Sequence, residues 1–446
     1  MSPPQLLRKL GSRDAALLVM GGIIGSGIFV NPSRVAKMLH TTPYIMAAWV
    51  IGGFVALVGA GVFAELGARR QENGGVYAYL RDAYHPLVAF AYGWTLLWVS
   101  QSGGVAASAV TFAFYLPVLL GMQFSSLTSK IIEIAVIATW TIVTCLGVRE
   151  STTAQNTFML AKIVAIAGII GVGIFAIGHA AGSQPATVPP DFNPIVALGL
   201  ALVPVMFSYS GWQTASFMSA EMKEPAKSLP LGMLYGVLGV VALYLGVNAV
   251  CLGVLGEQHL AATNTPASDV VNAVFGSVGA KIIAGVIALS TIGFILNQLI
   301  VAPRVYLQMA RDGTFFNILA KIDVRTHVPV VAIATQGAIT ILVAGFGIYD
   351  TILNWVTSVD SVFFAFSAAA LILFRRRDAR SGASKPFFSI PFHPWSTLLF
   401  GAVEAFIVLD ILFKDPVNSG YGFLLLLSSV PFFFLFTWWH ERNANV

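Results

Sequence analysis

Residues 21–29 read GGIIGSGIF, and four glycines fall within the first seven positions of this stretch. The stretch lies inside an apolar run that begins at Ala15. Each glycine weakens a helix by about 1 kcal/mol relative to alanine, so a long apolar helix should avoid such a cluster. The run therefore predicts a helix that is interrupted near its middle.

The composition of the whole chain indicates a protein that lies in lipid. Hydrophobic residues make up 57% of the 446 residues and charged residues only 10%, with a mean hydropathy of +0.80. A soluble chain of this length could not cover its core with so few charges. The two cysteines, Cys145 and Cys251, both lie in apolar runs, so we expect no disulfide framework. The scattered histidines predict no metal site, and no motif indicates a cofactor.

The apolar runs predict an all-α integral membrane protein with twelve membrane-spanning helices, at about 20 residues per crossing. We expect a short N-terminal segment at 1–13, a ten-helix core at 14–374 and two additional helices with a tail at 375–446. The core divides into helices one to five, about 14–178, and helices six to ten, about 194–374. The expected spans are 14–38, 44–68, 85–119, 130–148, 153–178, 194–220, 230–256, 270–310, 328–347, 351–374, 395–413 and 419–440.

The distribution of basic residues predicts the orientation of these spans. With a cytoplasmic N-terminus, 19 Lys and Arg residues fall on the inner side and five on the outer side. The positive-inside rule then places both termini in the cytoplasm and explains the basic net charge without a nucleic-acid partner. One basic residue remains, Lys162, about ten residues into the fifth span. An ionisable residue at that depth indicates a functional site.

A second interruption lies five spans after the first. The sequence MFSYSGWQTASF at 206–217 breaks the apolar pattern of the sixth span at Ser208, Ser210 and Gly211. Paired interruptions in corresponding spans of two halves indicate a transporter binding site. Because each half has five helices, an odd number, the second half must be inverted relative to the first.

Two broken helices can bind a zwitterion without a charged side chain. The amides freed at a half-helix N-terminus suit a carboxylate, and opposing carbonyls suit an ammonium group. Small residues leave these groups uncovered, but they also allow close helix packing. We interpret Gly21 and Gly22 as packing residues, and Gly25, Ser26 and Gly27 as part of the binding site.

Four stretches together resemble the amino acid–polyamine–organocation (APC) superfamily, most closely its L-type amino acid transporter branch. GGIIGSGIFV at 21–30 is similar to the first-helix signature, and residues 207–230 resemble the sixth helix and the following loop. Residues 63–84 and the ARDG at 310–313 are similar to the loops after helices two and eight. The resemblance covers helices one to ten, and the last two helices match only in kind. It implies the five-plus-five inverted-repeat fold (LeuT-like, or APC, fold) and alternating access.

The resemblance also implies roles for individual residues of the two breaks. Ser26 and Gly27 would contact the substrate carboxylate. The carbonyls of Ile23, Phe207 and Ser210 would contact its ammonium group. Phe207 would form a lid, or gate, over the substrate on the outer side.

In the family, a lysine at the position of Lys162 lies beside the unwound part of helix one and replaces a bound sodium ion. Ser290 and Thr291 on helix eight would lie nearby. Members that pair with a glycoprotein subunit carry a cysteine in the loop after helix three. The corresponding segment here, 121–130, has none, so we expect no disulfide-linked partner.

The positions of acidic residues in the spans indicate the charge of the substrate. No acidic residue falls at the predicted midplane of helices three, six or eight, which favours neutral amino acids over cationic ones. We expect Asp360 to lie near the membrane interface, within the first turns of helix ten. Glu65, at the end of the second span, is interpreted either as part of an inner-gate or loop-anchoring ion pair or as a solvated helix end.

These observations lead to a secondary transporter that carries neutral amino acids across the plasma membrane, independently of sodium, by exchange or facilitated diffusion. A proton-coupled symporter is the alternative, since Lys162 could exchange a proton. An intramembrane enzyme would need a nucleophile and base at membrane depth, and a channel would need a polar filter. The sequence shows neither.

Overall fold

The computed structural model describes residues 10–70, 74–147, 152–177, 187–326, 328–347, 349–382, 384–414 and 416–444. Within these ranges all regular elements are helices, and the single isolated bridge joins Leu10 to Met222. The all-α prediction is therefore confirmed.

The first half of the chain begins with two short helices in place of the first span. The described elements are α1 (Ser12–Ile23), α2 (Gly27–Leu39), α3 (Thr42–Arg69), α4 (Val76–Ala83), α5 (Pro86–Thr95), the π-helix η1 (Leu96–Ser100), α6 (Gln101–Leu120), α7 (Ser126–Cys145) and α8 (Thr152–Ala176).

The second half also begins with a broken span. Its elements are α9 (Pro194–Tyr209), the 3-10 helix η2 (Trp212–Glu221), α10 (Pro225–Ala262), α11 (Pro266–Val301), α12 (Pro303–Arg311), η3 (Asn317–Ala320), α13 (Val330–Phe346), α14 (Tyr349–Ser381), α15 (Trp395–Lys414) and α16 (Pro416–Ala444). Several of these helices begin with proline, which has no N–H to leave unpaired in the first turn.

Among the described residues, ten helices or continuous helix runs are long and apolar enough to cross a membrane. The bent pair α1 and α2, with 46° between the two helices, makes an eleventh span. The ninth expected span corresponds to Val330–Phe346, which is apolar but only 17 residues long. A multi-pass membrane protein is confirmed, and the twelfth crossing stays a prediction.

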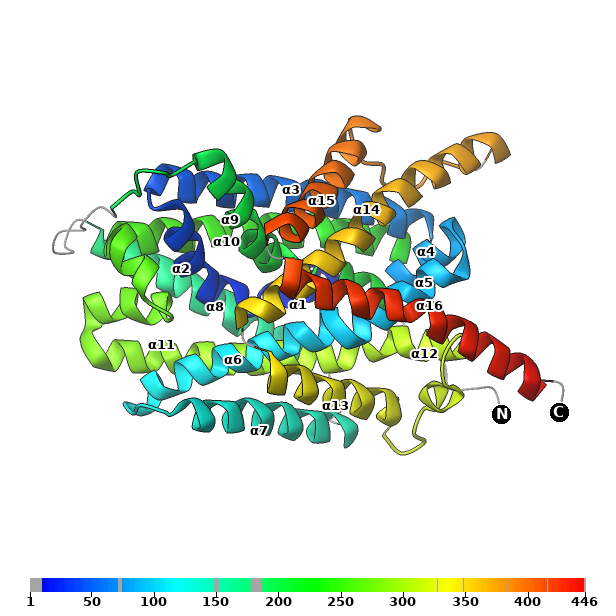
Figure 1. Ribbon diagram of the computed structural model, residues 1–446, viewed down its shortest axis with the longest axis horizontal. Coiled ribbons are helices and arrows are strands. Elements are labelled where there is room, and N and C mark those ends of the chain that lie inside the picture. The colour runs from blue at the N-terminus through cyan, green and yellow to red at the C-terminus, as the bar shows by residue number, and fades with distance from the viewer. Residues whose placement is uncertain are drawn as a thin grey trace.

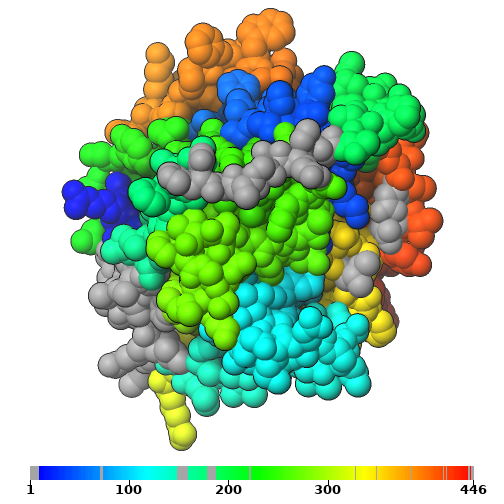
Figure 2. Space-filling model, turned by 90° about the vertical axis from the view of Figure 1, so that its left-hand side faces the viewer, coloured from blue at the N-terminus to red at the C-terminus, as the bar shows by residue number. Residues whose placement is uncertain are grey.

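The long helices run side by side along the longest axis of the molecule (Figure 1). α7 and α13 pack together along one edge, and α15 lies at the opposite edge with the end of α14. α4 and α12 lie at one end, the predicted cytoplasmic end. At the other end the segment that joins α10 to α11 lies at the centre of the face, beside the end of α6 (Figure 2). α1 lies inside the bundle, packed against α10, η2 and α8.

The two interrupted spans contact each other at their breaks. A Cβ atom on Gly22 would lie 2.6 Å from the carbonyl oxygen of Gly211 and 2.3 Å from Oγ1 of Thr214. Gly211 itself has φ +118°, in the left-handed region that favours glycine. The backbones therefore approach closely because these positions carry no side chain.

Candidate functional site: a cavity between two broken helices

The first break exposes the N-terminus of α2. α1 ends at Ile23, and the amide of Gly25 donates to the Ile23 carbonyl at 2.8 Å. The next amide with a backbone partner is that of Phe29, which donates to the Ser26 carbonyl at 3.1 Å. Among the described residues, no acceptor pairs with the amides of Ser26 and Gly27. A helix N-terminus with free amides carries partial positive charge and suits a carboxylate.

The second break ends α9 at Tyr209 and frees backbone groups of the next two residues. The Gly211 amide donates to Oε1 of Gln213 at 3.0 Å, and its carbonyl accepts from Oγ1 of Thr214 at 2.7 Å. The hydroxyl of Ser210 donates to the Phe207 carbonyl at 2.9 Å. These short local hydrogen bonds hold the break without continuing the helix.

Close packing around the first break leaves no room for side chains at its glycines, whether or not a ligand is bound. A Cβ on Gly21 would lie 2.8 Å from Sδ of Met159, in agreement with a packing role, whereas Gly22 both packs against Gly211 and lines the cavity described below. A Cβ on Gly25 would lie 2.9 Å from the Phe294 ring, and one on Gly27 would lie 2.7 Å from Cα of Ser208. Packing and cavity lining thus act together at Gly25 and Gly27.

A cavity of about 40 Å³ lies between the two breaks. Its free space is enough for a few water molecules. All six residues predicted to bind substrate line it: Ile23, Gly25, Ser26, Gly27, Phe207 and Ser210. The structure brings these residues together, and their contact with substrate stays a prediction.

The predicted ammonium ligands differ in how free their carbonyls are. The Ile23 carbonyl accepts from the Gly25 amide and, at 3.2 Å, from the hydroxyl of Tyr244. The Phe207 carbonyl accepts only from Ser210 in the described structure. Since a carbonyl oxygen has two lone pairs, Ile23 is the least available of the three predicted ligands.

An aromatic and ionic cover closes the side of the cavity toward the end of α2. The rings of Phe207 and Tyr349 meet edge to face, with centroids 6.2 Å apart. The Tyr349 hydroxyl donates to Oδ1 of Asn31 at 3.2 Å, and the Arg34 guanidinium lies 4.4 Å from the Tyr349 ring centroid. Arg34 also forms an ion pair with Asp350. Phe207 therefore borders the cavity on the side of α2 and Tyr349, and its role as a lid on the outer side stays a prediction.

Lys162 lies beside the first break, as predicted. Its side chain is 4% exposed, and Nζ donates to the Ile24 carbonyl at 3.2 Å. The ammonium group also lies 5.9 Å from the Phe294 ring centroid. Oγ1 of Thr291 donates to the Ala288 carbonyl, and Oγ of Ser290 has no partner among the described residues. Neither hydroxyl bonds to Lys162 in this conformation, so their supporting role stays a prediction.

The prediction for Asp360 is wrong: its carboxylate is buried and lines the cavity. α14 begins at Tyr349, so Asp360 lies about 16 Å along the helix at 1.5 Å per residue. That is about half the thickness of a hydrocarbon core. Oγ of Ser100 donates to its Oδ1 at 2.5 Å. The distance from the helix start could have shown this depth from the sequence.

Four further polar residues of the cavity wall were not identified from the sequence. They interrupt apolar runs in the third, sixth and eighth spans. Polar residues at such positions in the sequence could have been identified as candidate site residues. The four residues are Ser100, Gln101, Gln213 and Gln298.

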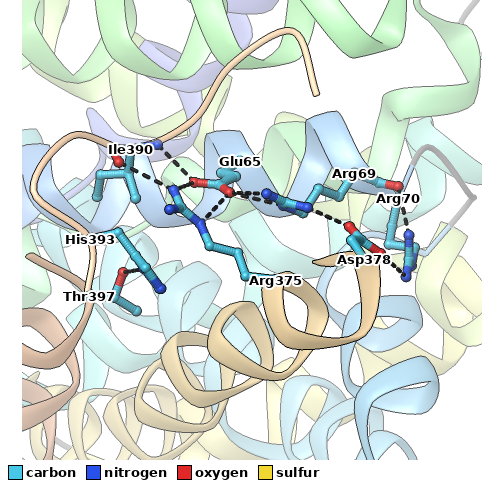
Figure 3. Close-up of polar contacts among 8 residues, drawn as sticks. All are labelled: Glu65, Arg69, Arg70, Arg375, Asp378, Ile390, His393 and Thr397. Atoms are coloured by element: carbon cyan, nitrogen blue, oxygen red, sulfur yellow. Dashed lines mark hydrogen bonds and ion pairs between the residues drawn. The ribbon is translucent and has the colours of Figure 1, made fainter. Parts of the chain in front are cut away.

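A second polar cluster lies at the predicted cytoplasmic end (Figure 3). The fully buried Glu65 accepts from Nε of Arg375 at 2.7 Å, from Nε of Arg69 at 2.9 Å and from the Ile390 amide at 2.8 Å. Arg69 also pairs with Asp378. Of the two interpretations of Glu65, the ion pair is therefore confirmed, and its partners come from α3, α14 and the segment before α15.

Next to this cluster, His393 is in contact with Thr397 (Nδ1 to Oγ1, 3.0 Å). Burial, with the positive charge of nearby Arg375, lowers the pKa of His393 below its usual range. The lower pKa favours the neutral form of the imidazole beside the cluster.

Apolar spans packed around two adjacent helix breaks, with a polar cavity between the breaks, define a membrane transporter. A family model described as amino acid permease matches residues 10–437, and the chain belongs to this family. The chain is thus a transporter and not an enzyme, and its resemblance to the APC superfamily is confirmed.

Three human relatives match nearly the whole chain. The large neutral amino acids transporter small subunit 2 is 29% identical over 445 residues, covering 98% of this chain and 82% of the relative. The Asc-type amino acid transporter 1 is 28% identical over 447 residues, covering 99% and 84%. The cystine/glutamate transporter is 27% identical over 444 residues, covering 98% and 87%.

Proposed function

We propose that this protein carries neutral amino acids across the plasma membrane by alternating access, independently of sodium, through exchange or facilitated diffusion. The free amides of Ser26 and Gly27 bind the substrate carboxylate, and the carbonyls of the second break bind its ammonium group. The names of the relatives, which include neutral amino acids, support this substrate class.

The observation that carries the proposal is the position of Lys162. Its ammonium group bonds to the Ile24 carbonyl at the first break, and a second cation beside it would be repelled. A tethered cation therefore takes the place of a coupling ion and stabilises the unwound backbone.

The test measures uptake of a radiolabelled neutral amino acid into vesicles that contain the purified protein. We expect the same uptake when choline replaces sodium, and faster uptake when unlabelled substrate is placed on the far side. Lys162→Ala should lower uptake about tenfold or more at equal membrane insertion, because the break loses its internal cation. Lys130→Ala is the matched control, since Lys130 pairs with Glu133 near the outer end of α7. A steep dependence on sodium would contradict the proposal.

Proton-coupled symport is the second candidate, because Lys162 and Asp360 are both ionisable and buried next to the two breaks. A proton gradient imposed across the same vesicles separates the two mechanisms. Symport predicts accumulation that follows the gradient, whereas exchange follows only the substrate on the far side.

We also propose that both termini are cytoplasmic and that the chain functions without a disulfide-linked glycoprotein subunit. Cys251 is fully buried in α10, and Sγ of Cys145 lies 3.7 Å from the Val330 carbonyl oxygen. The connection between α6 and α7 contains no cysteine. Neither thiol is placed to reach a partner at the outer surface.

A further inference from the structure

We infer that Asp360 and Ser100 form the side-chain end of the substrate cavity and select amino acids whose short side chain donates a hydrogen bond. The inference rests on the proposed function and refines its substrate class. It follows from an excess of hydrogen-bond acceptors at this end of the cavity.

The carboxylate of Asp360 is far from satisfied by its own protein. The described structure gives it one hydrogen bond, from the neutral hydroxyl of Ser100, and no ion pair. An ionised carboxylate offers about four acceptor positions. Lys162, the buried basic residue beside the first break, donates to the Ile24 carbonyl. A further hydrogen-bond donor would stabilise a buried acidic group that has so little compensation inside a membrane.

Two more acceptors without partners lie on the same cavity wall. Oε1 of Gln101 and Oε1 of Gln298 have no hydrogen-bond partner among the described residues, and both side chains are 4% exposed. Gln101 follows Ser100 directly, and Gln298 comes from α11. A hydrogen-bond donor on a substrate side chain would satisfy such acceptors, whereas an alkyl side chain would leave them unpaired.

The helix geometry of the third span presents this wall to the cavity. The π-helix η1 (Leu96–Ser100) lies between two α-helices and ends at Ser100. A π-turn shifts the faces of the flanking helix and is frequent at functional sites. As a result, the consecutive residues Ser100 and Gln101 both line the cavity, and Ser100 reaches Asp360 on α14.

The cavity places the acceptors close to the substrate backbone. Asp360 and Ser100 line the same small cavity as Ser26, Gly27 and Ser210, so a short side chain is enough to bring a donor to them. The absence of acidic residues at the midplane of helices three, six and eight favours neutral substrates, but Asp360 on helix ten adds an acidic group to the cavity. A hydroxyl and a short ammonium group are therefore both donors that fit, and matched substrate pairs distinguish them.

The experiment measures competition for uptake in vesicles that contain the purified protein. Threonine is compared with valine, which has the same shape without the hydroxyl, and 2,3-diaminopropionate is compared with 2-aminobutyrate. We expect the donor-bearing member of at least one pair to compete about tenfold better or more, because unpaired buried acceptors penalise its partner. The pair with the larger ratio identifies hydroxyl or ammonium as the preferred donor.

Variants of the protein test which residues cause the preference for a side chain that donates a hydrogen bond. Asp360→Asn and Ser100→Ala should each lower the ratio toward one. Ser102→Ala is the control for the hydroxyl, since Ser102 donates to the Leu97 carbonyl and does not line the cavity. Glu133→Gln is the control for a buried carboxylate, because Glu133 lies on α7, pairs with Lys130 and does not line the cavity. Both controls should keep the ratio of the unchanged protein.

Equal competition within both pairs in the unchanged protein would overturn the inference, whether or not the variants fold. An unchanged ratio in Asp360→Asn would overturn it as well. Uptake of amino acids without donor preference would contradict only this inference, whereas no uptake of any amino acid would contradict the proposed function itself.

Discussion

The apolar ring of Phe207 lines the cavity, and the residues around the ring explain how it could act as a lid. The ring lies at the end of α9, half-buried, and meets Tyr349 of α14 edge to face. It covers the cavity from the side on which Arg34 pairs with Asp350. A ring in this place can close over a bound substrate by excluding water.

This arrangement predicts how substitutions at Phe207 should rank. Phe207→Ala should lower uptake about tenfold or more, because the cavity loses its apolar cover, whereas Phe207→Tyr and Phe207→Trp should keep part of the uptake. Uptake is measured per protein inserted in the membrane. Phe346→Ala is the matched control, since Phe346 is 86% exposed on α13. Equal loss in all three variants would indicate ordinary packing instead of a lid.

At the scale of single residues, the sequence identified functional residues better than it predicted the side chains that surround them. Phe207 is one of 32 phenylalanines, and only its place in a family motif distinguished it. Lys162 was found because it is the basic residue left inside a span. The depth of Asp360 follows from its distance to the start of helix ten, whereas its partner, Ser100, lies 260 positions away in the chain. A pairing of this kind depends on tertiary contacts that a local pattern does not contain.

At the scale of elements, the two helix breaks are packing interfaces as much as binding surfaces. The sequence predicted interruptions in spans one and six, and they occur at residues 24–26 and 210–211. Glycine and serine identify such breaks because they weaken a helix locally. The π-helix at Leu96–Ser100 has no such signal, since the residues LLWVS contain neither glycine nor proline. It was therefore not predicted.

Close packing at the first break predicts that Gly27→Val disables the protein. The Cβ would lie 2.7 Å from Cα of Ser208, so α2 and α9 would have to separate. Overpacking of this kind costs about 1–3 kcal/mol, and it would also move the free amides of the break. We expect a lower melting temperature and a loss of uptake of about tenfold or more.

Gly171→Val is the matched control for this substitution. Gly171 lies on α8, where an added Cβ would meet nothing within 4 Å. The same change of residue should there leave both the melting temperature and uptake nearly unchanged. Normal uptake by Gly27→Val at an unchanged melting temperature would show that the contact between α2 and α9 does not hold the site.

At the scale of the whole molecule, buried charges lie both beside the cavity and at the predicted cytoplasmic end. The count of basic residues predicts which end faces the cytoplasm, but it does not predict which acidic residues they pair with. The structure joins Glu65 of α3 to Arg375 of α14 and to the backbone of Ile390 (Figure 3). This cluster fixes the end of α14, the helix that also carries Asp360 into the cavity.

The cluster predicts that Glu65→Gln destabilises the protein and impairs uptake together. The amide keeps the size of the side chain but removes the negative charge, which leaves Arg69 and Arg375 close together without a common partner. Removing one member of a buried ion pair typically costs about 3–5 kcal/mol, so we expect a clearly lower melting temperature. Asp191→Asn, in an exposed segment before α9, is the matched control and should change neither property.

A double-variant comparison distinguishes a direct interaction from general damage at the cytoplasmic end. If Glu65 acts through Arg375, then Arg375→Gln should cost a similar amount, and the double variant should cost less than the sum of the two single variants. The measurement is thermal unfolding of the purified protein, with uptake measured in parallel. Additive losses would show that the two residues act independently, and α14 would then have to be held in place by its helix packing, which includes α15, α16 and α6.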